Sequence, residues 1–175
     1  MNRFTFASNT INGKGYIDTS ATIPDSAKVS MHHSIDVYFQ VNVKTFDSGN
    51  SRMNRDMFKA LKAEQYPNIE FKLDSLQLEE SLTSSEAKVL VQSTVRVAGV
   101  ENTISFPVTM THVSNELFHL QGSEEVRMTD HDVEPPTALF GLVQARDNLT
   151  VEFDIYASKS VGSTVALHQT RKDKE

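Results

Sequence analysis

The sequence predicts an all-β fold, an antiparallel β-barrel of about eight strands with one short helix. Over most of the 175 residues, apolar side chains alternate with polar ones, which is the pattern of strands with one buried face. Most connections between these segments are of hairpin length, and one segment alone has apolar residues at helical spacing. A barrel is preferred to a sandwich because closure removes the exposed edges that such apolar strands would otherwise present.

The first strands are expected near the N-terminus. Residues 3–7 place Phe4 and Phe6 on one face, and a turn is expected at residues 12–15, NGKG, before a second short strand. From residue 29 to residue 43 the alternation is sustained, which is long for one strand of a globular protein. This run is therefore either one long barrel strand or two strands joined by a bend.

The helix is expected after residues 47–51, DSGNS, whose polar side chains suit an N-cap. From Met53 to Leu61 the apolar residues follow helical spacing. Pro67 disfavours the helical conformation at the residue before it, so the helix should end before the next strand begins.

The remaining strands follow at residues 69–78, 89–97, 104–110, 117–128 and 149–155. In the first of these the alternation slips by one residue, which predicts a β-bulge near residues 74–75. Residues 1–157 are expected to form one barrel domain. We interpret residues 158–175 as a frayed C-terminal tail, or as a tail with a short helix near residues 165–169.

Composition excludes several classes of function. The net charge of -6 is spread without a basic stripe, which argues against a nucleic-acid partner. The apolar runs are too short for stable membrane insertion, and residues 1–20 show no signal peptide. The absence of cysteine excludes disulfides, thiolate zinc sites and cysteine nucleophiles, but it does not fix the compartment.

No catalytic or metal-binding constellation stands out. Residues 130–132, DHD, lack a recognised metal-ligand spacing, and neighbours on an extended segment point in opposite directions. A nucleophile with a nearby base and a nucleotide-binding glycine pattern are both missing from the sequence. We therefore expect no catalytic residues, no metal and no cofactor.

Four motifs occur in an order and spacing typical of one family. They are NRD at residues 54–56, YPNIEF at 66–71, VAGVENT at 97–103 and PPTALFG at 135–141. With these motifs, residues 26–157 resemble the YceI-like, polyisoprenoid-binding proteins. The resemblance implies a lipocalin-like barrel that is periplasmic or secreted. It also implies that the protein transports or sequesters a long-chain isoprenoid or similar amphiphilic lipid, such as a polyprenyl phosphate or a quinone.

The chain departs from the family pattern at its start. Members of the family usually open with a strand pair, and often a signal sequence, ahead of the segment that contains Phe4 and Phe6, and neither is visible here. Either this opening has been lost, or the chain is a fragment or a shortened form, so the sequence leaves open whether the barrel is complete at the N-terminus. An open edge would favour pairing with a second copy in a homodimer, or with a partner strand.

The inward faces of the expected strands supply the wall of the lipid site, and the helix supplies a lid. Alternation alone fits a dry core equally well, so the alternative is a protein-interaction or scaffold barrel filled by its own side chains. The expected ligand-binding residues are Phe4, Phe6, Val37, Phe39, Val41, Met57, Leu61, Phe71, Leu73, Val91, Val95, Phe106, Val108, Met110 and Phe153.

Overall fold

The structure is a computed structural model that describes residues 5, 7–17, 30–31, 35–81, 85–138, 143–160 and 164–169. Most of this part of the chain is strand, with one α-helix and two 3-10 helices. The strands are β1 (Asn12–Ile17), β2 (Ser30–Met31), β3 (Ile35–Asn42), β4 (Asn68–Ser81), β5 (Glu86–Val97), β6 (Val100–Ser114), β7 (Leu117–Arg127), β8 (Thr137–Ala138), β9 (Val143–Gln144), β10 (Asn148–Ser160) and β11 (Thr164–Gln169), and the helices are η1 (Val43–Thr45), α1 (Ser51–Ala60) and η2 (Met128–His131).

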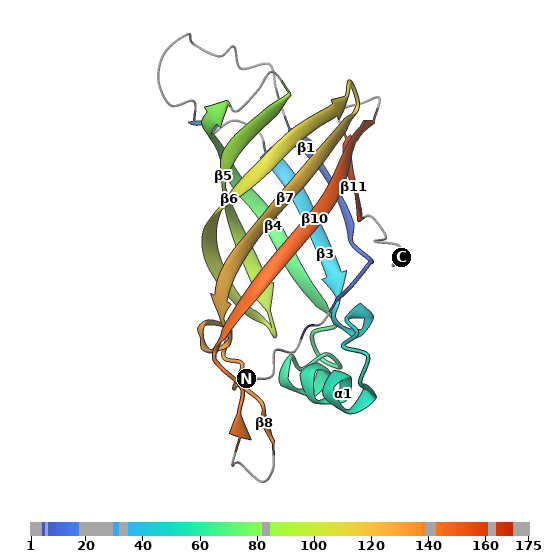
Figure 1. Ribbon diagram of the computed structural model, residues 1–175, viewed down its shortest axis with the longest axis vertical. Helices are drawn as coiled ribbons and strands as arrows, with labels where there is room; N and C mark the ends of the chain where they lie inside the picture. The colour runs from blue at the N-terminus through green and yellow to red at the C-terminus, as the bar shows by residue number, and fades with distance from the viewer. Residues whose placement is uncertain are drawn as a thin grey trace.

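The main sheet is an antiparallel, lipocalin-like barrel (Figure 1). Its strands follow the order β2-β4-β3-β1-β11-β10-β7-β6-β5, and β4 also pairs with β5, which closes the sheet on itself. Strands β2 and β3 both pair with β4, so β2 does not add a further strand around the ring. The ring itself therefore has the predicted eight strands. Strands β8 and β9 form a separate two-stranded sheet.

Closure of the barrel, which the sequence left open, is present in the structure. Strand β1 pairs with both β3 and β11, and β11 pairs in turn with β10, so the described strands form a complete ring. The helix expected near residues 165–169 is wrong, because this stretch is β11. Its pairing with β10, the preceding strand, and with β1, a strand distant in sequence, decides its conformation, so residues beyond 157 contribute to the barrel instead of forming only a tail.

The turn expected at residues 12–15 is wrong as well, because Asn12–Ile17 is a continuous strand. Gly13 lies opposite Phe39 on β3, and a Cβ atom on Gly13 would come within 2.4 Å of the Phe39 Cβ. The glycine therefore permits a close approach between two strands and does not mark a turn.

Other expectations about the strands are confirmed. Strands β2 and β3 both pair with β4, and the register of β4 against β5 shifts between Leu73 and Ser75, where the bulge was predicted. Phe4, Phe6 and residues 32–34 lie outside the described residues.

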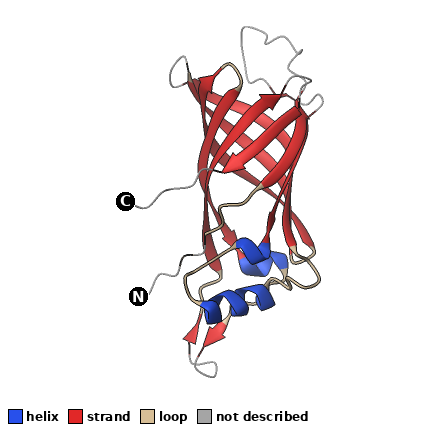
Figure 2. Cartoon of the chain, turned by 90° about the vertical axis from the view of Figure 1, so that its right-hand side faces the viewer, coloured by secondary structure: helices blue, strands red, loops and turns tan. Residues whose placement is uncertain are grey.

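Helix α1 lies beyond one end of the barrel, which we call the α1 end (Figure 2). Its N-cap is Asn50, whose side chain accepts hydrogen bonds from the backbone N–H groups of Arg52 and Met53. Strand β3 finishes and β4 starts at the α1 end. Across the described residues, no helix combines the length and the apolar character needed to cross a membrane.

Candidate functional site

The described strands bring the expected ligand-binding residues that they contain onto one face, the inner face of the barrel. The register joins Phe39 to Phe71, Phe71 to Val95 and Val91 to Phe106 around the ring. All described members of the expected set have limited exposure. Val37, Val91, Val95, Phe106 and Val108 are buried, whereas Phe39, Val41, Met57, Leu61, Phe71, Leu73, Met110 and Phe153 are half-buried.

Side chains fill the middle of the barrel. Phe39 stacks on Phe71 with ring centroids 4.5 Å apart, and Phe106 meets Phe153 edge to face at 5.7 Å. Two apolar clusters, one around Phe106 and one around Ile155, include the ring of Phe153. A ligand on the inner face must therefore lie to one side of this aromatic layer or displace part of it.

Gly122 fixes the position of Phe153 in this layer. Both residues pair across β7 and β10, and a Cβ atom on Gly122 would lie 2.4 Å from the Phe153 Cζ and 2.9 Å from the Pro107 carbonyl oxygen. Only glycine leaves room for both neighbours. The aromatic ring can thus lie flat across the strand at the level where β6 and β7 meet.

Between this layer and the α1 end, two apolar residues on the inner face of β10 are exposed. Leu149 and Val151 of β10 are on the same side of the strand as Phe153, yet they are 47% and 42% exposed. Glu124, which is half-buried, lies opposite Val151 on β7. Leu149 and Val151 were not among the residues expected to bind ligand, although the alternation places them on the same face as Phe153.

Met57 and Leu61, the expected lid, belong to α1 and the residue that caps its C-terminus. Both are half-buried, and the helix as a whole lies at the α1 end of the barrel (Figure 2). The cationic residues of the helix, Arg52, Arg55 and Lys59, are exposed.

Residues 130–132 do not converge on a common point. Asp130 accepts a hydrogen bond from Arg127, and Asp132 caps η2 in the left-handed conformation with φ of 52°. Within the described residues, no group of three histidine, aspartate or glutamate side chains could hold a metal ion.

His131 is buried at the α1 end, a feature that the sequence pattern did not reveal. Its Nδ1 lies 3.2 Å from the carbonyl oxygen of Val100, and this contact requires the proton on Nδ1 because a carbonyl can only accept. Its Nε2 has no hydrogen-bond partner among the described residues. Asn102 strengthens the same junction by donating from Nδ2 to the carbonyl oxygen of Asp130.

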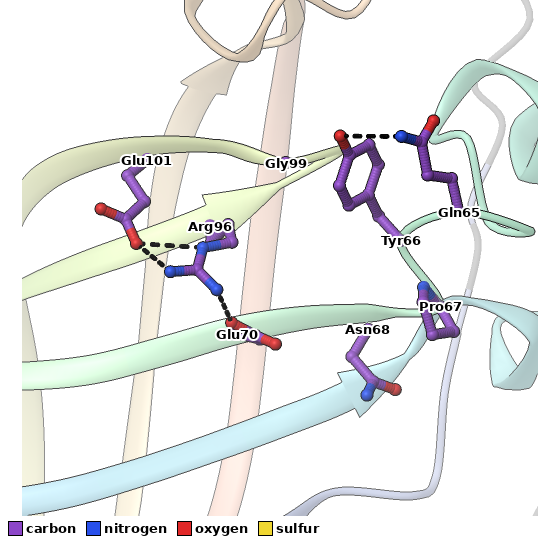
Figure 3. Close-up of a pocket in the computed structure, with 8 residues that line it drawn as sticks. All are labelled: Gln65, Tyr66, Pro67, Asn68, Glu70, Arg96, Gly99 and Glu101. Atoms are coloured by element: carbon purple, nitrogen blue, oxygen red, sulfur yellow. Dashed lines mark hydrogen bonds and ion pairs between the residues drawn. The ribbon is translucent and has the colours of Figure 1, made fainter.

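A pocket of about 590 Å³ lies on the outer face of the wall, where the start of β4 meets the β5–β6 hairpin (Figure 3). At its centre, Arg96 donates from Nη1 to Glu70 Oε2 at 2.8 Å and from Nε to Glu101 Oε1 at 3.0 Å. Burial and the negative charge of Glu70 raise the pKa of Tyr38, which lies beside this ion-pair cluster. None of the expected ligand-binding residues lines the pocket, and its charged lining does not suit an apolar tail.

A histidine–carboxylate contact also lies on the outer face. His119 Nε2 is 2.7 Å from Asp154 Oδ1, and the His119 ring stacks on Tyr156 with centroids 4.4 Å apart. Both strands turn these side chains away from the face that bears Phe153. The pair is therefore separate from the apolar inner face.

Comparison with known proteins gives a consistent picture. The sequence model of the YceI-like domain matches residues 2–157. The fold is similar to the Campylobacter jejuni YCEI protein, with a TM-score of 0.67 and 12% identity over 92% of this chain and 88% of that one. It is also similar to Burkholderia cenocepacia BcnA, with a TM-score of 0.58 and 14% identity over 84% and 96%.

A third similar structure is a polyisoprenoid binding domain from Saccharophagus degradans implicated in plant cell wall breakdown. Its TM-score is 0.56, with 10% identity over 97% of this chain and 100% of that one. No curated protein sequence matches the chain.

Proposed function

Because the chain belongs to the YceI-like family, we propose that it is a non-catalytic protein that binds a long-chain isoprenoid or a similar amphiphilic lipid on the inner face of its barrel. A polyprenyl phosphate or a quinone is the type of ligand that fits. The polyisoprenoid binding domain among the similar structures supports this class of ligand. Transport or sequestration in the periplasm or outside the cell is the role that we propose with it.

The observation that favours this function most is the exposed apolar surface formed by Leu149 and Val151. Large apolar side chains on the concave face of a barrel usually pack against one another, as Phe106 and Phe153 do here. Leu149 and Val151 instead remain 47% and 42% exposed on the face that continues from Phe153. A bound apolar tail would cover them and remove that surface from water.

The energetics of such binding are favourable. Each isoprene unit has five carbons, so its burial contributes on the order of 3–4 kcal/mol before other costs, at about 0.8 kcal/mol per methylene-sized group. Three or four buried units would outweigh the entropy lost on association. Because one unit differs little from the next, the protein should discriminate poorly among apolar tails of similar length.

Organic extraction of protein purified from bacteria, followed by mass spectrometry, tests this function. We expect a long-chain isoprenoid or related lipid in near-stoichiometric amount from the unaltered protein. The matched variants are Val151→Glu on the inner face and Thr150→Glu, its exposed neighbour on the opposite face. The lipid should be depleted from Val151→Glu and retained by Thr150→Glu.

Extracts without lipid, combined with no binding of added geranylgeraniol, would overturn the proposal. That result would favour the alternative, a scaffold barrel filled by its own side chains. The alternative also predicts that Val151→Glu is as stable and as compact as the unaltered protein, with no ligand lost.

A further inference from the structure

The backbone pairing of the barrel wall is interrupted between residues 100–107 of β6 and residues 123–127 of β7, and we call this unpaired stretch the side opening. The two strands pair only beyond it, from Val108 with Gly122 to Ser114 with Leu117. Within the opening β6 pairs with β5 on its other side, and β7 pairs with β10 on its other side. All residues on both edges are among those that the structure describes.

Pro107 explains why the pairing stops. The next pair in register would join Pro107 to Ser123, and the carbonyl of Pro107 points toward β7, because it lies close to Gly122. Both backbone polar groups of a strand residue point to the same side, but proline has no N–H to donate. The ladder between β6 and β7 therefore loses its next hydrogen bond at Pro107, and the strands separate.

The opening is closed at both ends. At one end Phe153 lies across Gly122 and contacts Phe106. At the α1 end η2 is tied to the start of β6, since His131 donates to the Val100 carbonyl and Asn102 donates to that of Asp130. At about 3.3 Å per residue, the β6 edge between Asn102 and Phe106 is roughly 13 Å long.

The chemistry of the opening suits an apolar tail. Leu149 and Val151 are next to it on β10, directly across β7, and both are exposed on the inner face. Glu124, the strand partner of Val151, places a carboxylate on the same face. A phosphate would be repelled there, whereas an uncharged tail would bury apolar surface without needing a polar partner.

We propose that the lipid tail enters and leaves the barrel sideways, through this side opening, with any anionic head group remaining outside. This inference rests on the proposed function, because it concerns the route of the same ligand. Leu149 and Val151 would be the first apolar residues of the inner face that the tail contacts.

Stopped-flow fluorescence with dansyl-labelled geranylgeraniol tests the route. The chain has no cysteine, so Val151→Cys and Thr150→Cys each provide a single site for a bulky maleimide adduct. We expect the adduct at residue 151 to lower the association rate constant about tenfold or more. The adduct at residue 150 should change this constant less than about twofold. Both changes lie within the range that association rate constants usually span among variants of one site.

A second variant, Pro107→Val, restores the missing N–H. Hydrogen exchange reports whether the added amide is protected, which would show that the ladder has extended across the opening. If the added amide is protected, the extra hydrogen bond favours the paired form of the two strands over the open form. One net hydrogen bond typically shifts such an equilibrium about fivefold, so association through the opening should slow by about that factor. Ser105→Val, an outward substitution on the same strand, is the control.

The outcomes separate the two proposals. If the unaltered protein does not bind the probe at equilibrium, the proposed function fails. If it binds and the adduct at residue 151 leaves the association rate unchanged, the function stands and the side opening is not the route. An adduct at residue 150 that slows binding as much as one at residue 151 would likewise overturn the route.

Discussion

Gly122 and Phe153 face each other across β7 and β10, so closely that a methyl group on Gly122 would lie 2.4 Å from the Phe153 Cζ. This contact places the Phe153 ring against Phe106 and sets the level at which the packed middle of the barrel ends. It also lies where β6 and β7 part. A single glycine thus links core packing to the shape of the proposed lipid site.

Replacing Gly122 by alanine should destabilise the protein. The added Cβ must displace the Phe153 ring or the Pro107 carbonyl, and overpacking of this kind costs about 1–3 kcal/mol. Urea denaturation measures the loss, with the exposed neighbour Ser123→Ala as the control. Adding Phe153→Leu to Gly122→Ala should recover part of it. If the losses of unfolding free energy caused by Gly122→Ala and Phe153→Leu simply added in the double variant, that result would contradict direct contact between these residues.

Stability should fall in acid through Asp147. This carboxylate accepts hydrogen bonds from the hydroxyl and backbone N–H of Thr129, which lower its pKa below the ordinary value. A carboxylate whose pKa is lower in the folded than in the unfolded state stabilises the folded protein. This stabilisation is fully present above the unfolded-state pKa of about 3.9, and it is lost as the pH falls through the folded-state pKa.

Denaturation midpoints between pH 6 and pH 2 would measure this effect. We expect the midpoint of Asp147→Asn to fall less steeply below about pH 4 than that of the unaltered protein, because asparagine does not titrate. Parallel curves for the two proteins would show that the Thr129–Asp147 contact does not contribute to acid stability.

The ion pairs of Arg96 should contribute little, although they are short. The Arg96 side chain is 47% exposed, and Glu101 is exposed as well. Exposed pairs of this kind are typically worth about 1 kcal/mol or less. Arg96→Met should therefore change the unfolding free energy by no more than about that amount, and it should leave lipid binding unaltered. Loss of lipid from this variant would contradict binding on the inner face alone and would indicate that the outer pocket around Arg96 takes part in lipid binding.

The inner face was predictable because strand alternation is local. Val91, Phe106 and Phe153 occur at period-two spacing, and pairing with neighbouring strands places them on one face. The bulge at Leu73 and Ser75 was visible for the same reason, since it shifts that spacing by one residue. The order of the motifs identified the family, which the match over residues 2–157 confirms.

Closure of the barrel was not predictable in this way. It depends on β1 pairing with β11, two short strands separated by most of the chain. Neither strand has an alternation long enough to stand out by itself. Gly13 was misleading too, since its role becomes visible only with Phe39 opposite it.

The exposed part of the inner face was hidden from the sequence for a related reason. Leu149 and Val151 look like ordinary core residues in a strand, and they are exposed where β6 and β7 separate. That separation begins at Pro107, which has no N–H to continue the ladder between the two strands. The burial of His131 follows from the short η2 helix, which the sequence pattern did not indicate.

The central claim is that an apolar tail binds on the inner face, and a single tryptophan tests it most directly. The chain has no tryptophan, so Leu149→Trp introduces a fluorophore on that face and Thr150→Trp introduces one on the opposite face. On titration with geranylgeraniol, the account predicts a saturable blue shift for Leu149→Trp and no shift for Thr150→Trp. An unchanged spectrum for Leu149→Trp at saturating lipid, or equal shifts for both variants, would contradict it.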